Sequence, residues 1–273
     1  MDRNILTLLF CVLGLASCEH KNKIQTNEIH YTTIYNKTLS LDGNGFGDAQ
    51  IVSNSYSSET RMGKLTFSKD VTEIGDSAFK DCSHLMSIIL PPSVTEIGYQ
   101  AFYWCENIKN ITIPESVKEI EEWNFAGCSN LDSITIPKSV TEIREGTFAY
   151  CSHLTSISIP ESVTKIGDVA FRGCSGLTSI IIPESVSKIG KCAFIDCSNL
   201  TNITIPSTVT EIGFRTFNRC ISLSNITIPK SVIKIGECAF ADCAGLTEVR
   251  IPKECNVHET AFKNCPNIKI IYY

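Results

Sequence analysis

Hydrophobic side chains return along this chain at a fixed period of 23 residues, with no insertion from about residue 65 to residue 254. One position of the repeat is phenylalanine in eight successive copies: Phe79, Phe102, Phe125, Phe148, Phe171, Phe194, Phe217 and Phe240. Another position is proline: Pro91, Pro114, Pro137, Pro160, Pro183, Pro206, Pro229 and Pro252. A fixed period of roughly 20–50 residues is typical of a solenoid, in which each coil packs only on its neighbours.

The pattern inside one copy, from Leu154 to Cys174, predicts its local structure. β-branched and small polar residues alternate up to Ile159, which indicates a strand, and Pro160 ends it because proline cannot donate to a β-ladder. We expect a second short strand at 163–166 and one helical or 3₁₀ turn before the cysteine. The predicted fold is therefore a β-rich solenoid of 23-residue coils with a parallel sheet, a short second strand and helical or 3₁₀ turns.

The residues before the repeat predict a cap, which a solenoid needs to cover its first coil. Residues 31–67 alternate weakly and contain a cluster of Gly, Asn and Asp at 42–48, which signals a turn between strands. We expect a hairpin cap at 31–67 and a solenoid of about nine coils at 68–273. A phosphate- or calcium-binding loop at 42–48 is the alternative, although its spacing matches neither a Walker motif nor an EF-hand.

The N-terminus has the pattern of an export signal. The apolar run at 5–15 is too short to span a membrane and is typical of a signal-peptide core. It ends in Leu-Ala-Ser-Cys, which resembles the lipobox of bacterial lipoproteins, whose cysteine is lipidated after cleavage. We expect a lipoprotein signal peptide at 1–17, a lipid on Cys18 and a polar tether at 18–30. An ordinary secretory signal with an incidental cysteine is the alternative.

The strand signature Leu-x-x-Ile-x-Ile at 154–159 resembles that of leucine-rich repeats. The Asn or Cys that usually follows this strand is absent, and Ser162 is the nearest polar residue. The strand signature together with the pattern Ile-Gly-x-x-Ala-Phe-x-x-Cys at 166–174 makes the repeat similar to the BspA-like, spirochaete-type class of leucine-rich repeat. That resemblance implies a bacterial surface or secreted protein, since several members are adhesins for host matrix proteins or other bacteria.

The net charge of the chain bears on which class of partner it can bind. The net charge is −5 and the isoelectric point is near 5.6, which argue against nucleic acid, because nucleic acid selects basic surfaces. We expect a monomer that contacts the membrane only through its lipid anchor.

A second column of the repeat is cysteine. An even set of cysteines in an exported chain indicates disulfides, but in-register neighbours keep their Cβ atoms ~5 Å apart, whereas a disulfide needs ~3.8 Å. We therefore expect buried structural thiols, with disulfides or a metal site as alternatives. The column consists of Cys82, Cys105, Cys128, Cys151, Cys174, Cys197, Cys220 and Cys243.

The sequence contains no pattern typical of an enzyme. The five histidines are scattered, and neither Gly-x-Ser-x-Gly nor His-Glu-x-x-His occurs. We expect a protein without catalytic residues, metal or cofactor.

A charged column runs beside the second strand. Its residues are Glu73, Glu96, Glu119 and Glu142, then Lys165 and Lys188, then Glu211 and Lys234. We interpret this column as a charged face exposed to solvent. An acidic patch that binds a basic partner or a cation is the alternative.

Aromatic residues gather in the second to fourth copies. Tyr103, Trp104 and Tyr150 follow the repeat phenylalanine at positions that are polar or small in most copies. Exposed aromatics mark binding surfaces, so these three are the candidate ligand-binding residues. Packing against the N-terminal cap is the alternative.

Together, these features predict a lipid-anchored binding or adhesion protein on the surface of a bacterial cell envelope. Its solenoid would recognise a protein ligand, either a host matrix protein or another cell-surface protein. A structural scaffold of the envelope without a host ligand is the alternative.

Overall fold

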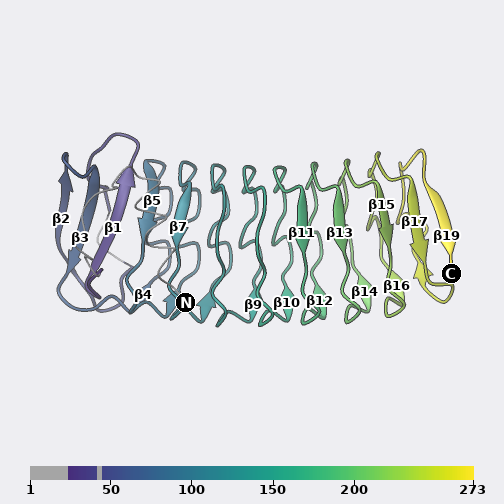
Figure 1. Cartoon of the computed structure of the whole chain (residues 1–273), viewed down its shortest axis with the longest axis horizontal. Coiled ribbons are helices and arrows are strands. Elements are labelled where there is room, and N and C mark those ends of the chain that lie inside the picture. Colours follow the sequence, from purple (N-terminus) through teal and green to yellow (C-terminus); the bar gives the residue numbers. More distant parts are fainter. Residues whose placement is uncertain (1–23, 42–44) are drawn as a thin grey trace.

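The computed structural model describes residues 24–41 and 45–273, which form one elongated β-solenoid (Figure 1). The predicted signal peptide, Cys18 and residues 18–23 of the predicted tether lie outside the described residues, as do residues 42–44. Two rows of strands run along the length of the solenoid, and nine short strands of the second row mark nine coils. The predicted β-rich solenoid of 23-residue coils is confirmed. We number the coils by their phenylalanine, from Phe79 in the first to Phe262 in the ninth.

The first row contains the strand that precedes each proline. Its strands pair in parallel with a shift of one repeat, so that Ile180 lies beside Ile203. In β13 the side chain of Ile203 is buried, whereas its neighbours on either side face solvent. Isolated bridges join Thr135, Ser158 and Ile181 in the middle of the row. The first-row strands are β5 (Leu85–Ile89), β7 (Asn110–Thr112), β11 (Ser179–Ile181), β13 (Asn202–Thr204), β15 (Asn225–Thr227), β17 (Glu248–Ile251) and β19 (Lys269–Tyr272).

The second row is shorter and also parallel. It consists of three three-stranded sheets, in which each two-residue strand pairs with that of the adjacent coil, as Ile74 does with Ile97. These strands are β4 (Glu73–Ile74), β6 (Glu96–Ile97), β8 (Glu119–Ile120), β9 (Glu142–Ile143), β10 (Lys165–Ile166), β12 (Lys188–Ile189), β14 (Glu211–Ile212), β16 (Lys234–Ile235) and β18 (Asn256–Val257).

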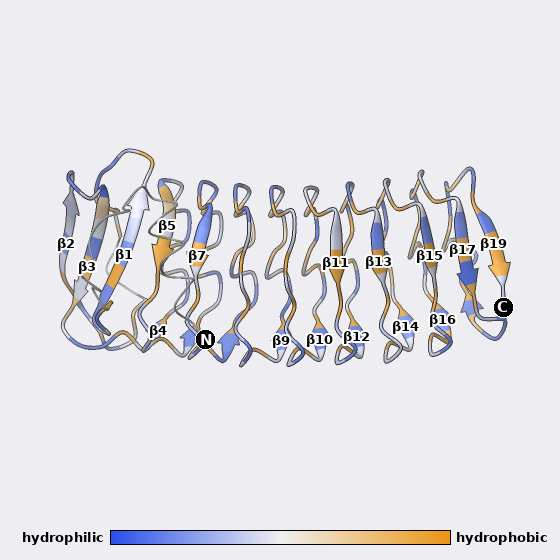
Figure 2. Cartoon of the chain, in the orientation of Figure 1, coloured by the Kyte–Doolittle hydropathy of each residue, from blue (hydrophilic) through white to orange (hydrophobic). Residues whose placement is uncertain are grey.

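An antiparallel sheet precedes the first coil. It is made by β1 (Glu28–Thr33), β2 (Ile51–Ser57) and β3 (Met62–Phe67), and β1 pairs antiparallel with β5, so this sheet continues the first row. Buried and half-buried residues alternate in β1 and β3. Figure 2 shows hydrophobic and hydrophilic segments within both strands. The strand β1 begins three residues inside the predicted tether of 18–30, because Ile29 is fully buried in the core.

The expected helical or 3₁₀ turns are not present: across residues 24–41 and 45–273 the structure contains strands and turns but no helix. In the fourth coil, only alternate N–H groups bond within the coil, such as that of Ala149 to the carbonyl of Gly146 at 3.0 Å. The others donate to the next coil, where Phe148 N–H bonds Ala170 at 2.9 Å. In an α-helix the N–H groups beyond the first turn all bond to carbonyls of the same helix, so this alternation excludes a helix here.

Left-handed backbone residues produce this alternation. Two columns have positive φ in nearly every coil, one two residues before the phenylalanine and one two residues after it. Val169 (φ 48°) belongs to the first column and Tyr150 (φ 62°) to the second. Left-handed residues interrupt a right-handed helix, and bulky side chains rarely occupy this region.

The phenylalanines form a continuous stack through the core. From Phe79 to Phe262, neighbouring rings lie 5.1–5.7 Å apart between centroids and within 17° of parallel. Phe46 meets Phe79 edge-on at 75° and so ends the stack beneath the antiparallel sheet. Aromatic pairs contribute about 0.5–1.5 kcal/mol each beyond the area that they bury, so the stack favours a constant step from coil to coil.

Near the proline, a serine hydroxyl joins most coils to the one before; Thr208 takes this role in one coil, and the equivalent Ser231 Oγ is buried without a partner. The carbonyl of Pro160 accepts the N–H of Val163 at 3.0 Å, which makes a tight turn. Inside that turn, Ser162 Oγ donates to the carbonyl of Val140 in the preceding coil at 2.7 Å. The serine therefore gives this repeat a polar contact between coils although the usual asparagine is absent.

Deleting one whole coil should leave a folded protein. Removing residues 160–182 joins Ile159 to Pro183 and preserves every column, whereas removing residues 160–171 shifts all later columns out of register. We expect the first variant to keep a cooperative thermal transition, within about 10 °C of the parent, because each coil interacts only with its neighbours. The second should aggregate. Circular dichroism and size-exclusion chromatography measure both, and equal tolerance of the two deletions would contradict stacking in register.

Candidate ligand-binding face

One long side of the solenoid is made by the turns that precede each column cysteine. We call this side the turn face: residues 75–81 in the first coil and the equivalent residues of every later coil. Its backbone hydrogen-bonds to the next coil, so its side chains project from a fixed frame. The predicted ligand-binding residues all lie on this face.

Trp104 and Tyr150 occupy the same column, two coils apart, and Gly127 lies between them in that column. Both residues are left-handed, with φ of 55° and 62°. A Cβ atom added to Gly127 would lie 2.8 Å from the indole of Trp104, and one added to Gly173 would lie 2.9 Å from the ring of Tyr150. Each ring therefore rests against a glycine of the following coil.

The same arrangement occurs in the other left-handed column, where Trp123 lies against Gly146. The coil that each ring covers is on its C-terminal side, away from the cap. Trp104 is 40% exposed and Tyr150 is 41% exposed, so the rings are held by the next coil and remain accessible.

Tyr103 adjoins Trp104. The two rings meet nearly edge-on, with centroids 6.2 Å apart, and Lys80 Nζ lies 5.1 Å from the centre of the Tyr103 ring. The structure thus brings Tyr103 and Trp104 together and places Tyr150 two steps further along, a separation of roughly 10 Å.

The predicted thiol column lies beneath the turn face. From Cys105 onward, each column thiol donates to the carbonyl of the phenylalanine one coil back, as Cys174 does to Phe148 at 3.1 Å. Cys82 is half-buried, and the other seven column cysteines are buried. Cys265 continues the pattern with the carbonyl of Phe240 at 3.1 Å. The structure contains no disulfide among the described cysteines.

Burial controls the protonation of these thiols. It raises the pKa of Cys174 and of Cys243 to about 12, and it raises the pKa of Cys128, Cys151 and Cys197 well above the ordinary value. A protonated thiol can donate to a carbonyl, which a thiolate cannot do. The folded protein therefore keeps these buried thiols protonated and unreactive at neutral pH.

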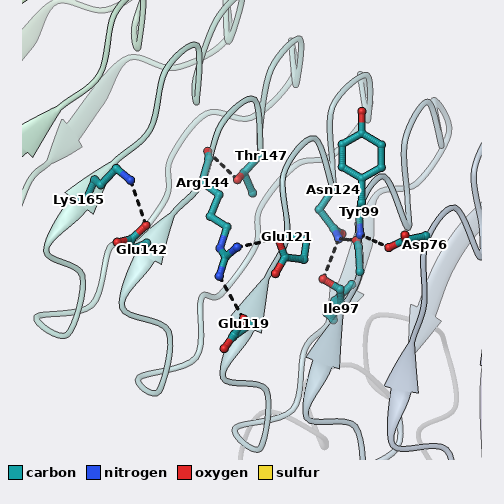
Figure 3. Close-up of polar contacts among 11 residues, drawn as sticks. Asp76, Ile97, Tyr99, Glu119, Glu121, Asn124, Glu142, Arg144, Thr147 and Lys165 are labelled. Carbon is teal, nitrogen blue, oxygen red and sulfur yellow. Dashed lines mark hydrogen bonds and ion pairs between the residues drawn. The ribbon is translucent and has the colours of Figure 1, made fainter. Parts of the chain in front are cut away.

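The acidic column is partly neutralised by basic side chains of later coils. Arg144 reaches Glu121 at 2.7 Å and Glu119 at 3.0 Å, and Lys165 reaches Glu142 at 3.2 Å (Figure 3). Burial, opposed by Arg144 and reinforced by nearby carboxylates, raises the pKa of Glu121. In residues 24–41 and 45–273, no group of three or more His, Cys, Asp or Glu could hold a metal ion.

A basic groove on the turn face of coils five to nine is a feature that sequence analysis missed. It encloses about 400 Å³, and its charged residues are Arg172, Asp196, Arg215, Arg219, Asp242 and Lys263. These residues fall in three different columns of the repeat, so no single column of the sequence shows the cluster. The one sequence feature that indicates the groove is the concentration of arginine residues in the turns of the later coils.

Comparisons with known proteins agree with this architecture. The family model described as the BspA type leucine rich repeat region matches residues 49–178 and 141–269. The chain is similar to the crystal structure of the leucine-rich-repeat protein of T. pallidum, with 31% identity and a TM-score of 0.56. That match covers 59% of this chain and 78% of the other.

Two further solved structures are similar. A leucine-rich-repeat protein from Eubacterium ventriosum shows 25% identity and a TM-score of 0.50, over 76% of this chain and 65% of the other. A leucine-rich cell surface protein from Faecalibacterium prausnitzii shows 27% identity over 74% of this chain and 83% of the other, with a TM-score of 0.35, too low to support an argument. No curated protein matches the chain.

The fold is a leucine-rich-repeat solenoid. More particularly, the chain belongs to the BspA-type leucine-rich-repeat family, because that family model covers most of its length. The resemblance inferred from the sequence is confirmed. Across the described residues, no helix is long and apolar enough to cross a membrane.

The buried thiols predict a loss of stability in alkali. A pKa raised in the folded state means that folding favours the protonated thiol, so this stabilisation is complete below the unfolded pKa of about 8.5. It is lost as pH rises towards the folded pKa of about 12 for Cys174. Between those values, each thiol should lower the free energy of unfolding by about 1.4 kcal/mol per pH unit.

Urea denaturation between pH 7 and pH 10 would measure this slope. Cys174→Ala should be less stable at pH 7, because it loses a buried hydrogen bond and leaves a small cavity. Its slope should also be shallower than that of the parent by about 1.4 kcal/mol per pH unit. Identical slopes for parent and variant would show that Cys174 does not titrate as the structure requires.

Proposed function

We propose that this protein is an exported, lipid-anchored surface protein that binds a protein ligand through the turn face of coils two to four. The observation that carries the proposal is the placement of Trp104 and Tyr150. Each ring is held by a glycine of the next coil and is about two-fifths exposed. Fixed, accessible aromatics give a large contact area with little entropy to lose on binding.

The fold itself does not require aromatic residues at these positions. The column contains glycine in the third and fifth coils, and glycine adopts the left-handed conformation without strain. A bulky residue there costs roughly 1–2 kcal/mol. Aromatic residues held in a strained conformation at solvent-exposed positions support a role in binding rather than in folding.

The remaining exposed strand face is a weaker candidate. Most outward residues of the first row, such as Thr112, Thr204 and Thr227, are small and polar, although Ile181 is 82% exposed. Interface residues that dominate affinity are enriched in Trp, Tyr and Arg, whereas Thr and Ser are under-represented. The turn face therefore offers the better ligand surface.

Attachment to the cell rests on the N-terminal sequence. The tetrapeptide at 15–18 follows an apolar run and ends in Cys18, as a lipobox does. Acyl chains hold a soluble domain at a membrane because each buried CH₂ contributes about 0.8 kcal/mol. A lipid at Cys18 and the polar residues that follow would place the solenoid outside the membrane.

Replacing Tyr103, Trp104 and Tyr150 together by Ala should weaken ligand binding by about 2 kcal/mol, which is roughly 30-fold in Kd. Surface plasmon resonance against immobilised matrix proteins would identify a ligand and then measure the loss. The matched control replaces Thr112, Thr135 and Ser158 by Ala and should bind like the parent. Thermal unfolding would show that both variants are folded.

The reverse result would contradict this assignment. If the aromatic variant keeps full affinity and the Thr/Ser variant loses it, the strand face is the ligand surface. If the parent binds no matrix or cell-surface protein, the envelope scaffold becomes the better account.

Replacing Cys18 by Ala should release the protein from the membrane fraction and abolish incorporation of labelled fatty acid, because no thiol remains to carry the lipid. Protease added to intact cells should degrade the wild-type protein. Full membrane retention and acylation of the Cys18→Ala variant would refute the lipid anchor, and resistance of the wild-type protein to external protease would refute surface exposure.

A further inference from the structure

The basic groove on the turn face has the geometry of a second ligand site. Residues from five successive coils line it, from Arg172 in the fifth coil to Lys263 in the ninth. Four steps of about 4.8 Å give it a length of roughly 19 Å, which an extended segment of about six residues would fill. It lies on the same face as the aromatic residues of coils two to four.

The groove is positively charged although the chain as a whole is acidic. Four cationic side chains and two carboxylates line it, which leaves a local charge of +2 against −5 for the chain. The two carboxylates already have partners. Asp196 pairs with Arg219 at 3.2 Å, and Asp242 accepts a hydrogen bond from Asn264 at 2.7 Å.

Three cations of the groove are left without a carboxylate. Among the described residues, Arg172, Arg215 and Lys263 make no ion pair. The Nε atom of Arg172 is also buried without a hydrogen-bond partner. That atom is enclosed by the protein, so the capacity of the groove to bind an anion rests on its three unpaired cations.

Arg172 also connects the groove with the aromatic residues. Its guanidinium lies over the ring of Tyr150, 5.4 Å from the centroid. A ligand that contacts Tyr150 would therefore reach the first cation of the groove directly.

The charges of the groove distinguish between classes of acidic ligand. A uniform polyanion, such as a sulfated polysaccharide, would place negative groups beside Asp196 and Asp242. An extended peptide instead alternates side chains with backbone N–H groups, so it can give carboxylates to the cations and N–H donors to the aspartates. Arginine favours carboxylates because its planar fork can bind both oxygens.

We propose that the groove of coils five to nine binds a short acidic peptide segment of the protein ligand. This inference rests on the proposed function, because it assigns the chemistry of one part of the same partner.

Fluorescence anisotropy with a defined probe tests the groove without an identified partner. The probe is a labelled hexapeptide that alternates aspartate with serine, and its matched control replaces each aspartate by asparagine. With residues 19–273, which lack the predicted lipid site, we expect the aspartate peptide to bind at low ionic strength and the asparagine peptide to bind at least tenfold more weakly. Binding should weaken further as salt is added.

A double variant locates the binding. Arg215→Gln with Lys263→Gln removes two exposed cations of the groove and should weaken aspartate-peptide binding at least tenfold. The control, Lys118→Gln with Lys188→Gln, makes the same change in net charge at exposed positions outside the groove and should bind like the parent. Both variants change only exposed side chains, and thermal unfolding would verify their folding.

Several outcomes would overturn the proposal: no binding of the aspartate peptide at millimolar concentration, equal binding of the asparagine peptide, or equal losses in both double variants. Stronger competition by dextran sulfate than by unlabelled peptide would assign the groove to polyanions instead. A matrix ligand that is lost from the aromatic variant but retained by the groove variant would refute the groove alone and leave the proposed function intact.

Discussion

The structure depends on direct stacking of each coil on the next, and the phenylalanine column shows this constraint most clearly. Parallel rings 5.1–5.7 Å apart require every coil to return the same atoms to the same place. The turn backbone imposes the same requirement, because alternate N–H groups such as that of Phe148 are satisfied only by the following coil. Since a buried unpaired N–H is costly, a coil that slipped by one residue would lose its core contacts and its hydrogen bonds together.

This constraint leaves the turn face able to vary in sequence. Backbone atoms make the contacts between coils there, so the left-handed position after the phenylalanine can contain Asp196, Arg219 or Trp104 on the same frame. The coils therefore differ in side-chain chemistry at a position where they share one backbone conformation. Aromatic residues in the early coils and cations in the later ones thus form one continuous, chemically varied surface, which suits recognition of an extended partner.

The periodic features could be predicted from the sequence because the fold repeats them. The period fixed the coil length, and the alternation before Pro160 indicated the first-row strand. The turn could not be predicted in the same way: Ala170 and Phe171 are compatible with a helix, and nothing in the residue types reveals that alternate N–H groups bond to the next coil. The aromatic residues were identified as candidates, but their support by Gly127 and Gly173 became visible only when residues 23 apart were placed in contact. The basic groove combines residues from several columns, so a search along single columns could not find it.

Native-state hydrogen exchange at the turn amides tests the central claim most directly. If stacking through the turns holds the coils together, the amides of Phe148 and Tyr150, which donate to Ala170 and Arg172, should exchange as slowly as the first-row amide of Ile228, which donates to Arg250. All of them should then open only with unfolding of the solenoid. Fast exchange at Phe148 and Tyr150 with continued protection at Ile228 would show that the strand rows alone join the coils, and would contradict this account.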